Sequence, residues 1–178
     1  TWRRGPVAQA RARGTSGEHH PERFIGAFPD PILRFLDLSD SMRIYLACTV
    51  RGDRGTIFVA RHIHDHLVDR GHQVLTSHLL RDDVDEVERN VSNRDVFLRD
   101  LAWLDSADMV VAEASGSTFG VGFEVGYILG RAAATGQRAY VVYQADRRDT
   151  VSRMISGLSH AQGAVLEYTS LTEIDAFL

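Results

Sequence analysis

The sequence contains no lysine, and all 20 of its basic residues are arginine. Genomic codon bias explains this composition as well as phosphate recognition does, so the missing lysine decides nothing by itself. Acidic residues outnumber the arginines, and the formal net charge of −4 gives the chain no general attraction to nucleic acid or to an anionic membrane surface. We therefore expect neither nucleic acid nor a membrane among its partners.

Cysteine occurs once, at Cys48, so no disulfide within the chain is possible. A single thiol is typical of cytoplasmic proteins, and the cytoplasm is the location that we expect. Because Cys48 lies in an apolar run, it is expected to pack as a small apolar side chain. No apolar run is long enough to span a membrane.

Residues 1–41 lack the patterning of the rest of the chain. Five arginines precede residue 25, apolar periodicity is weak, and the first acidic residue is Glu18. This composition predicts a flexible N-terminal extension with one short amphipathic helix after Pro31, although an organellar transit peptide would look similar. Met42 directly precedes the first apolar strand, so we expect a single working domain over residues 42–178.

From residue 43 the chain alternates between apolar runs and amphipathic helical stretches. The predicted strands cover residues 43–50, 73–79, 108–114, 138–144 and 164–170. Helical patterns lie between them at residues 56–71, 94–106, 119–135 and 151–159. This alternation predicts an α/β fold, a doubly wound Rossmann- or flavodoxin-like sheet of five parallel strands with helices on both faces.

Such sheets bind ligands beyond the carboxyl ends of the strands, where the strand order reverses. In a flavodoxin-like order the first and third strands are neighbours there, followed by the loops TVRGDRG and ASGSTFG. Amides at a helix start and the guanidinium of Arg51 suit a phosphate, although an ordinary turn with a solvated arginine explains the first loop equally well. The topology predicts that Arg51 and Glu124 share one crevice.

Two carboxylates are predicted to face this crevice. Asp100 shares the expected buried face of its helix with Phe97 and Leu104, so it needs either a partner, such as a loop amide, or a chemical task. Glu124 borders the apolar stripe of the helix over residues 119–135. Compensation of the helix dipole explains an exposed glutamate there, but it does not explain one on the inward side.

Glycines surround Glu124. Gly122, Gly126 and Gly130 are spaced by four and form a bare ridge, each about 1 kcal/mol less favourable than alanine in a helix. Such a ridge predicts the close approach of a ligand, another backbone or a second subunit. Two carboxylates beside phosphate-binding loops predict cleavage of a glycosidic bond in a nucleotide through an oxocarbenium-like state.

Four stretches, taken together and in order, resemble the 2′-deoxynucleoside 5′-phosphate N-hydrolases, relatives of the nucleoside 2-deoxyribosyltransferases. They are YLACTVRG, DLAWLDSADMVVAE, GVGFEVG and VSRMISG, and the resemblance covers about residues 43–178. It implies hydrolysis of the N-glycosidic bond of (2′-deoxy)nucleoside 5′-monophosphates, which gives free base and (deoxy)ribose 5-phosphate. No metal or cofactor is expected to take part.

The resemblance also implies roles for individual residues. Glu124 is the expected nucleophile, and Asp100 and Tyr45 are expected to position it and the sugar. The residues expected to bind the substrate are Thr49, Arg51, Gly52, His78, Thr118, Gly120 and Ser152, of which Thr49, Arg51, Gly52 and Thr118 are expected to hold the 5′-phosphate. His78 is expected near the base, whereas Ser152 is expected to reach the phosphate from the neighbouring subunit of a homodimer. Thr49 and Thr118 stand where the family commonly has serine, which keeps the hydroxyl and adds a methyl group.

Other interpretations stay open. Transfer of the deoxyribosyl group to another base would make the chain a nucleoside 2-deoxyribosyltransferase, which has no use for a phosphate site. A non-catalytic nucleotide-binding module would need the loops but neither carboxylate. His62 and His66 lie on one helical turn beside Asp65 and could bind zinc, but they fall off the apolar stripe, so we expect a solvated face.

Overall fold

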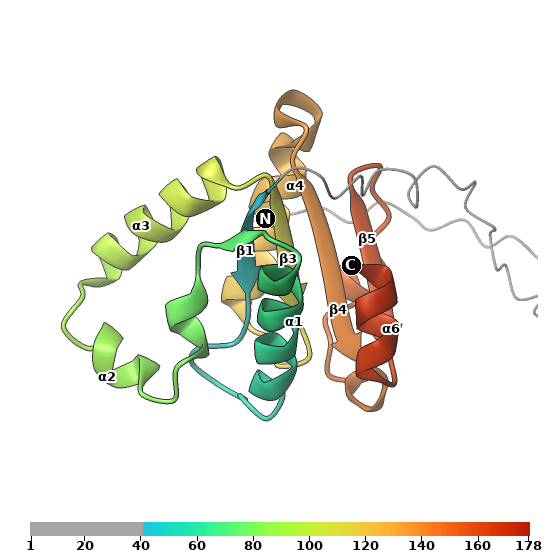
Figure 1. The fold of residues 1–178 in the computed structure, drawn as a ribbon, viewed down its shortest axis with the longest axis horizontal. Helices are drawn as coiled ribbons and strands as arrows, with labels where there is room; N and C mark the ends of the chain where they lie inside the picture. The colour runs from blue at the N-terminus through green and yellow to red at the C-terminus, as the bar shows by residue number, and fades with distance from the viewer. Residues whose placement is uncertain (1–40) are drawn as a thin grey trace, which may run out of the picture. The chain divides into compact units, whose positions relative to one another are not determined.

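The computed structural model describes residues 41–178 and contains a parallel sheet with the strand order β2-β1-β3-β4-β5 (Figure 1). This is the flavodoxin order, and the predicted doubly wound α/β fold is confirmed. The extension over residues 1–41 and the helix after Pro31 lie almost wholly outside the described residues. They stay predictions, as does the division of the chain at residue 42.

The sheet consists of β1 (Arg43–Ala47), β2 (Gln73–Val74), β3 (Met109–Glu113), β4 (Arg138–Gln144) and β5 (Gly163–Tyr168). β2 is much shorter than the predicted strand over residues 73–79. The reason is Thr76, whose hydroxyl accepts from the Leu46 amide at 3.0 Å and donates to the Leu46 carbonyl at 2.7 Å. The Thr76 hydroxyl thus occupies the backbone groups of Leu46 that would otherwise pair with the backbone of β2, and β2 ends early.

The helices are α1 (Ile57–Asp69), α2 (Val84–Glu88), α3 (Asn93–Ser106), α4 (Phe119–Thr135), α5 (Arg153–Ser156) and α6 (Leu171–Phe177). Two short 3₁₀ helices, η1 (Ser77–Leu80) and η2 (Ala145–Arg147), join them. α4 and β4 have the predicted bounds, whereas α2 and α6 were not predicted. Among the described residues, no helix is long and apolar enough to cross a membrane.

Alternate residues of each strand build two cores, one on each face of the sheet. On one face Ile44 and Leu46 pack with buried side chains of α1 and α6. On the other face Tyr45 and Ala47 pack with buried side chains of α4 and with Leu104 of α3. Figure 1 shows α1 and α6 in front of the sheet and α4 behind it. The apolar stripe of α4 therefore holds the start of that helix at the carboxyl end of β3.

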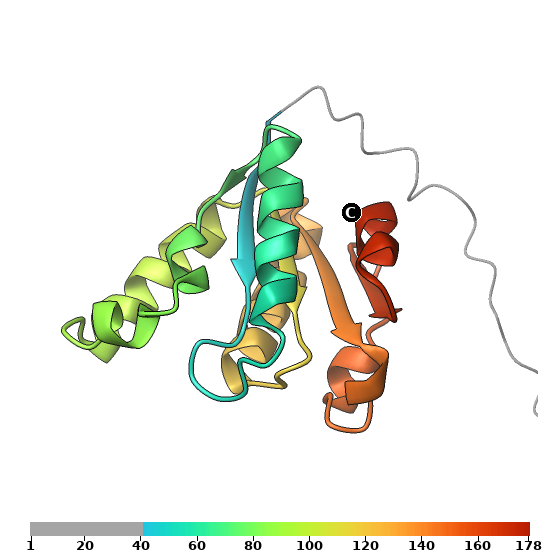
Figure 2. The ribbon, with the colours of Figure 1, turned by 60° about the horizontal axis from the view of Figure 1, so that its bottom comes forward.

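α2 and α3 project away from the sheet on the side of β1 (Figures 1 and 2). Ser92 caps α3 by accepting a hydrogen bond from the Asp95 amide at 3.1 Å. Only the carboxyl end of α3 reaches the sheet, where Leu104 is buried, whereas Phe97 is 50% exposed. The prediction that Phe97 marks a buried face is therefore wrong within one chain.

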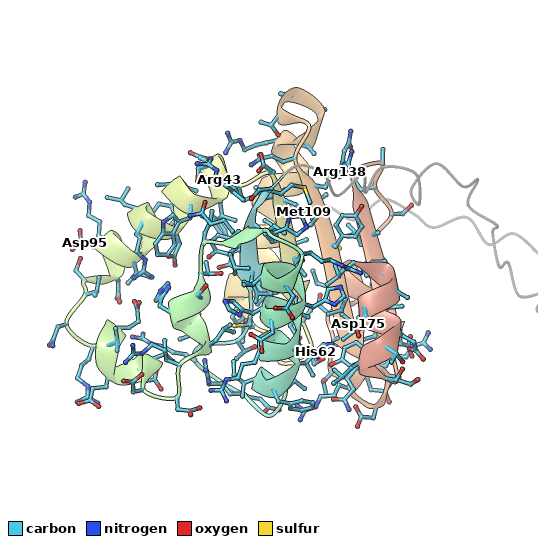
Figure 3. All side chains as sticks on the ribbon, in the orientation of Figure 1. Arg43, His62, Asp95, Met109, Arg138 and Asp175 are labelled. Atoms are coloured by element: carbon cyan, nitrogen blue, oxygen red, sulfur yellow. The ribbon has the colours of Figure 1, made fainter. Side chains whose placement is uncertain are left out.

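α6 changes the environment of the two histidines on α1. His62 Nε2 lies 2.7 Å and His66 Nδ1 lies 3.2 Å from Asp175 Oδ1 of α6 (Figure 3). The predicted solvated face is wrong, because the sequence pattern did not indicate the helix that covers it. In the described part of the chain, no group of three or more histidine, cysteine or acidic side chains could hold a metal ion.

Candidate active site

Glu124 lies on the second turn of α4 and faces β1. Tyr45, fully buried in β1, donates a hydrogen bond from its hydroxyl to Glu124 Oε1 at 2.7 Å. Burial raises the pKa of Glu124 to about 7; the Tyr45 hydrogen bond lowers this pKa and the negative charge of Asp100 raises it. Burial and the adjacent Glu124 also raise the pKa of the Tyr45 hydroxyl, so this group stays a donor.

A cavity of about 290 Å³ lies beside Glu124 at the carboxyl ends of β1 and β3. Its volume is at the lower end of the range of small-molecule sites, roughly 300–1,000 Å³. The residues that line it are Cys48, Val50, Arg51, Leu79, Glu88, Asn93, Val96, Arg99, Asp100, Thr118, Gly120, Val121 and Glu124. Arg51 and Glu124 thus meet in one crevice, as the topology predicts.

The loops after β1 and β3 pack closely against each other. Gly52 has a φ of +128°, and a Cβ added there would lie 3.5 Å from the Thr49 methyl and 3.6 Å from the Thr118 methyl. Thr49 is buried, and its hydroxyl has no hydrogen-bond partner among the described residues. Arg51 is exposed and, like Gly120, lines the cavity. Three predicted phosphate ligands, Thr49, Gly52 and Thr118, therefore cluster at its edge.

Gly116 permits this close packing. A Cβ at residue 116 would lie 2.1 Å from Thr49 Oγ1 and 2.8 Å from the Asp53 carbonyl oxygen, so only glycine fits. The next residue, Ser117, has a φ of 48°, which is uncommon for a residue with a side chain. Strained backbone of this kind is often found at functional sites. The sequence shows Gly116 only as one glycine in a loop.

Glu113 is a buried carboxylate that the sequence analysis did not single out. It ends β3 and accepts hydrogen bonds from Thr56 Oγ1 at 2.8 Å and from the Ser115 amide at 3.2 Å. Burial raises its pKa. Because Thr56 precedes α1 and Ser115 precedes α4, Glu113 ties together the starts of the two helices. An acidic residue at the end of the apolar run MVVA was the available signal.

Arg99 connects three parts of the cavity wall. Its Nε donates to Asp100 Oδ1 at 2.9 Å, and its Nη1 donates to Glu88 Oε1 at 2.8 Å. The guanidinium lies over the ring of Trp103, 4.9 Å from the ring centroid. The partner that Asp100 needs is therefore Arg99 rather than a loop amide. Sequence reasoning missed Arg99 and Glu88, because their pairing depends on how α2 returns to α3.

His78 lies behind this cluster on η1. Its ring is 5.2 Å from that of Trp103, and its Nε2 is 3.3 Å from Glu88 Oε1. Burial and the charge of Arg99 lower the pKa of His78. His78 touches the cavity wall through Glu88 and does not itself line the cavity.

Ser152 lies apart from the other predicted site residues. It caps α5 by accepting from the Met154 amide at 3.3 Å, and it lines a second cavity of about 580 Å³. That cavity contains Thr118 and several apolar side chains, but neither Glu124 nor Arg51. Within one chain, Ser152 therefore does not join the site around Glu124.

The chain is similar in sequence to proteins of a known family. Residues 44–172 match the Nucleoside 2-deoxyribosyltransferase family. A Thermofilum pendens protein named "Putative 2′-deoxynucleoside 5′-phosphate N-hydrolase 1" is 37% identical over 132 residues, which cover 74% of this chain and 89% of that protein. The 5-hydroxymethyl-dUMP N-hydrolase of Danio rerio is 33% identical over 119 residues, which cover 66% of this chain and 80% of that protein.

A solved structure shares the fold. The CMP N-glycosidase BcmB of Clostridium botulinum superposes with a TM-score of 0.52 at 17% identity, covering 76% of this chain and 99% of that chain. At 17% identity this similarity shows a shared fold and nothing more. The match over residues 44–172 and the two curated relatives show that the chain belongs to the nucleoside 2-deoxyribosyltransferase family.

Proposed function

We propose that the chain is a nucleotide N-glycosidase, which hydrolyses the N-glycosidic bond of nucleoside 5′-monophosphates and releases free base and (deoxy)ribose 5-phosphate. The curated relatives are named as N-hydrolases of such nucleotides. The observation that carries the proposal is the Tyr45–Glu124 hydrogen bond at the wall of a cavity that also contains Arg51 and Thr118. A paired carboxylate beside phosphate-type donors favours an enzyme over a binding module.

In the proposed reaction Glu124 attacks C1′ of the bound nucleotide as a carboxylate. The C1′–N bond breaks, its electron pair leaves with the base, and the base takes a proton from solvent. Water then attacks C1′, displaces Glu124 as a carboxylate and loses a proton to solvent, so the sugar gains a hydroxyl group. Tyr45 holds the carboxylate in place from β1, and Asp100 is assigned to the sugar because it lines the same cavity.

The 5′-phosphate is assigned to the loops after β1 and β3. Thr49, Gly52 and Thr118 cluster there, with Arg51 and Gly120 on the adjacent cavity wall. Amides at the start of α4 and the arginine fork are suitable donors to a phosphate. The base then occupies the other side of Glu124, towards α2 and α3, where His78 supports the wall through Glu88.

A panel of substrates tests this function. We expect release of free base from nucleoside 5′-monophosphates, measured by chromatography, and much less from the matching nucleosides, because the loops would have no phosphate to bind. Deoxyribonucleotides should be preferred to ribonucleotides, as the resemblance implies for a tyrosine at Tyr45. A second free base in the assay reveals transferase activity as a new nucleotide. Equal turnover of nucleosides and nucleotides would remove the phosphate site from the proposal.

The pH dependence of this reaction should follow Glu124. Since the pKa of Glu124 is about 7 and the nucleophile must be ionised, kcat/KM should fall about tenfold per pH unit below that value. Asp100→Asn removes a charge that raises this pKa, so the acidic limb should move to lower pH. Tyr45→Phe removes a hydrogen bond that lowers it, so the limb should move to higher pH.

Rate profiles of the three proteins check these directions. The phosphate of the substrate also titrates near pH 6, but its contribution is the same in all three profiles. Shifts of the two variants in the same direction, or a flat profile through about pH 5.5–7 in the parent, would contradict the assignment of the limb to Glu124.

The active unit is proposed to be a homodimer in which Ser152 completes the phosphate site of the partner. Phe119 is fully exposed, and Phe97, Phe123 and Met154 are at least half exposed. The Phe97 and Phe123 rings are 6.2 Å apart, and the second cavity joins Phe119, Phe123 and Met154, so these side chains form one apolar surface. An exposed apolar surface of this kind is typical of an interface.

The glycine ridge of α4 supports the same proposal. A Cβ added at Gly122, Gly126 or Gly130 would have no neighbour within 4 Å, so no other backbone of the described chain approaches the ridge. The sequence allows three explanations of the ridge: a ligand, another backbone of the same chain, or a second subunit. The second is excluded for the described residues, so a ligand or a second subunit remains. A second subunit also explains why Ser152 lies outside the site of its own chain.

Complementation distinguishes the two arrangements of Ser152. Glu124→Ala should abolish turnover, and Ser152→Ala should lower it about 10–100-fold through one lost phosphate contact. If Ser152 acts across the interface, each mixed dimer has one intact site, and an equimolar mixture after subunit exchange should recover about a quarter of the parental activity. If Ser152 acts within its own chain, mixing restores nothing. A strictly monomeric active protein also excludes the proposal.

A further inference from the structure

Glu88 is a buried carboxylate that the proposed reaction does not use. It ends α2, is 8% exposed, and lines the same cavity as Glu124. Its Oε1 accepts from Arg99 at 2.8 Å and lies 3.3 Å from His78 Nε2, whereas its Oε2 has no hydrogen bond with any described residue. A buried carboxylate is unfavourable unless donors surround it, so a free oxygen at a cavity wall is suited to a donor on a ligand.

The position of Glu88 assigns it to the base. The proposed phosphate donors Arg51, Thr118 and Gly120 lie on the loops at the sheet and at the start of α4, whereas Glu88 lies on α2, which projects away from the sheet (Figure 2). A nucleotide with its phosphate at the loops and C1′ at Glu124 extends its base towards α2 and α3. The wall there also includes the apolar side chains of Leu79 and Val96, which suit the faces of a planar ring.

The charges around Glu88 determine which base edge it accepts. Arg99 is shared between Glu88 and Asp100 and lies over Trp103, so its direction is fixed and it neutralises only one of the two carboxylates. The wall therefore carries a net negative charge. The 4-keto oxygen of a uracil or thymine presents lone pairs to this wall and is repelled, whereas a 4-amino group or a hydroxyl on the C5 substituent presents a hydrogen.

We propose that Glu88 selects nucleotides whose pyrimidine carries a hydrogen-bond donor at position 4 or on the C5 substituent, either the 4-amino group of a cytosine or a hydroxyl on the C5 substituent of a uracil. This inference rests on the proposed function and names the substrate class within it. Glu88 then acts as a specificity-determining residue, because its free oxygen contacts the base and takes no part in bond cleavage.

Two matched pairs of substrates test the inference. dCMP and dUMP differ at the 4-amino group, and 5-hydroxymethyl-dUMP and dTMP differ by one hydroxyl. We expect the parent protein to favour the donor-bearing member of at least one pair by about tenfold or more in kcat/KM, which is the effect of one hydrogen bond to a charged group. The pair that shows the preference identifies the donor.

Glu88→Gln should reduce that preference to within about threefold, because the amide presents a donor as well as an acceptor. The ratio within a pair cancels any effect that the substitution has on Arg99, Asp100 or the rate of cleavage. Glu86→Gln is the matched control, since Glu86 lies on the same helix and is exposed, and it should keep the full preference. If Glu88→Gln fails to fold, N4,N4-dimethyl-dCMP provides the test on the parent protein, because it lacks the donors of dCMP.

Failure of the inference and failure of the proposed function give different results. A parent protein that cleaves both members of each pair equally, or a Glu88→Gln variant that keeps the preference, overturns the role of Glu88 alone. A parent protein that releases no base from any nucleotide overturns the proposed function. In that case calorimetric affinities of the four nucleotides still decide the role of Glu88, because selection by its carboxylate requires a difference in binding.

Discussion

Glu124→Ala is expected to lower turnover by at least about four orders of magnitude while the fold stays intact. The covalent route through C1′ disappears with the carboxylate. Among the described residues, no other acidic side chain accepts a hydrogen bond from Tyr45 and could replace it. Affinity for the product (deoxy)ribose 5-phosphate should persist, since its phosphate contacts the loops after β1 and β3. Single-turnover base release and calorimetry measure the two effects separately.

The stability of this variant provides an internal control. Burial raises the pKa of Glu124 from its model-peptide value of 4.5 to about 7, so the folded state holds a proton that the unfolded chain releases. Ionised Glu124 therefore destabilises the parent protein as the pH rises from 4.5 to 7, and this cost is fully present above pH 7. Above pH 7 the variant should melt no lower than the parent. Activity within tenfold of the parent would remove Glu124 from the mechanism.

Gly116→Ala is expected to have the largest effect of any single methyl group added to the site. The new Cβ would overlap Thr49 Oγ1 and the Asp53 carbonyl, so the loops after β1 and β3 must move apart. Overpacking of this kind typically destabilises a fold by about 1–3 kcal/mol. Because the same movement separates Thr49 from Thr118, KM for nucleotides should rise more strongly than KM for any nucleoside that is cleaved.

Ser170→Thr serves as the matched substitution. Ser170 is exposed before α6, which packs on the opposite face of the sheet from α4, and threonine adds one methyl group while it keeps the hydroxyl. Its melting temperature should equal that of the parent. If Gly116→Ala instead had the melting temperature of the parent and the same KM for nucleotides, the contact between the two loops would have no part in phosphate binding.

The sequence allowed the strand order and the meeting of two loops to be predicted, because alternation and handedness constrain a parallel sheet strongly. The bounds of α4 follow from its glycine C-cap and its apolar stripe. β2 was predicted too long, since no pattern reveals that the Thr76 side chain occupies the backbone groups of Leu46. The periodicity of a segment indicates its own secondary structure, but it does not indicate a contact with another segment, such as that between Thr76 and Leu46.

The candidate site divides in the same way. Glu124, Asp100 and Arg51 were predictable because topology places the ends of β1 and β3 together and a charge on an apolar helix stands out. Glu88 and Glu113 were not, since Glu88 depends on how α2 packs against α3 and η1, and Glu113 depends on a contact with a residue far away in the sequence. Glu113 meets Thr56 across 57 positions of sequence, and no spacing rule covers that interval.

Because α2 and α3 project from the sheet, the two halves of the cavity are supported by different parts of the fold. The phosphate half is held by the central strands and by Gly116, where one methyl group is too many. The opposite half is built on an arm that reaches the two cores through Val84 of α2 and Leu104 of α3. Residues on the arm can therefore vary, in nature or in a designed library, without disturbing the strands that hold Tyr45. With the proposed assignment, one reaction centre can in this way be fitted with many different base-recognition surfaces.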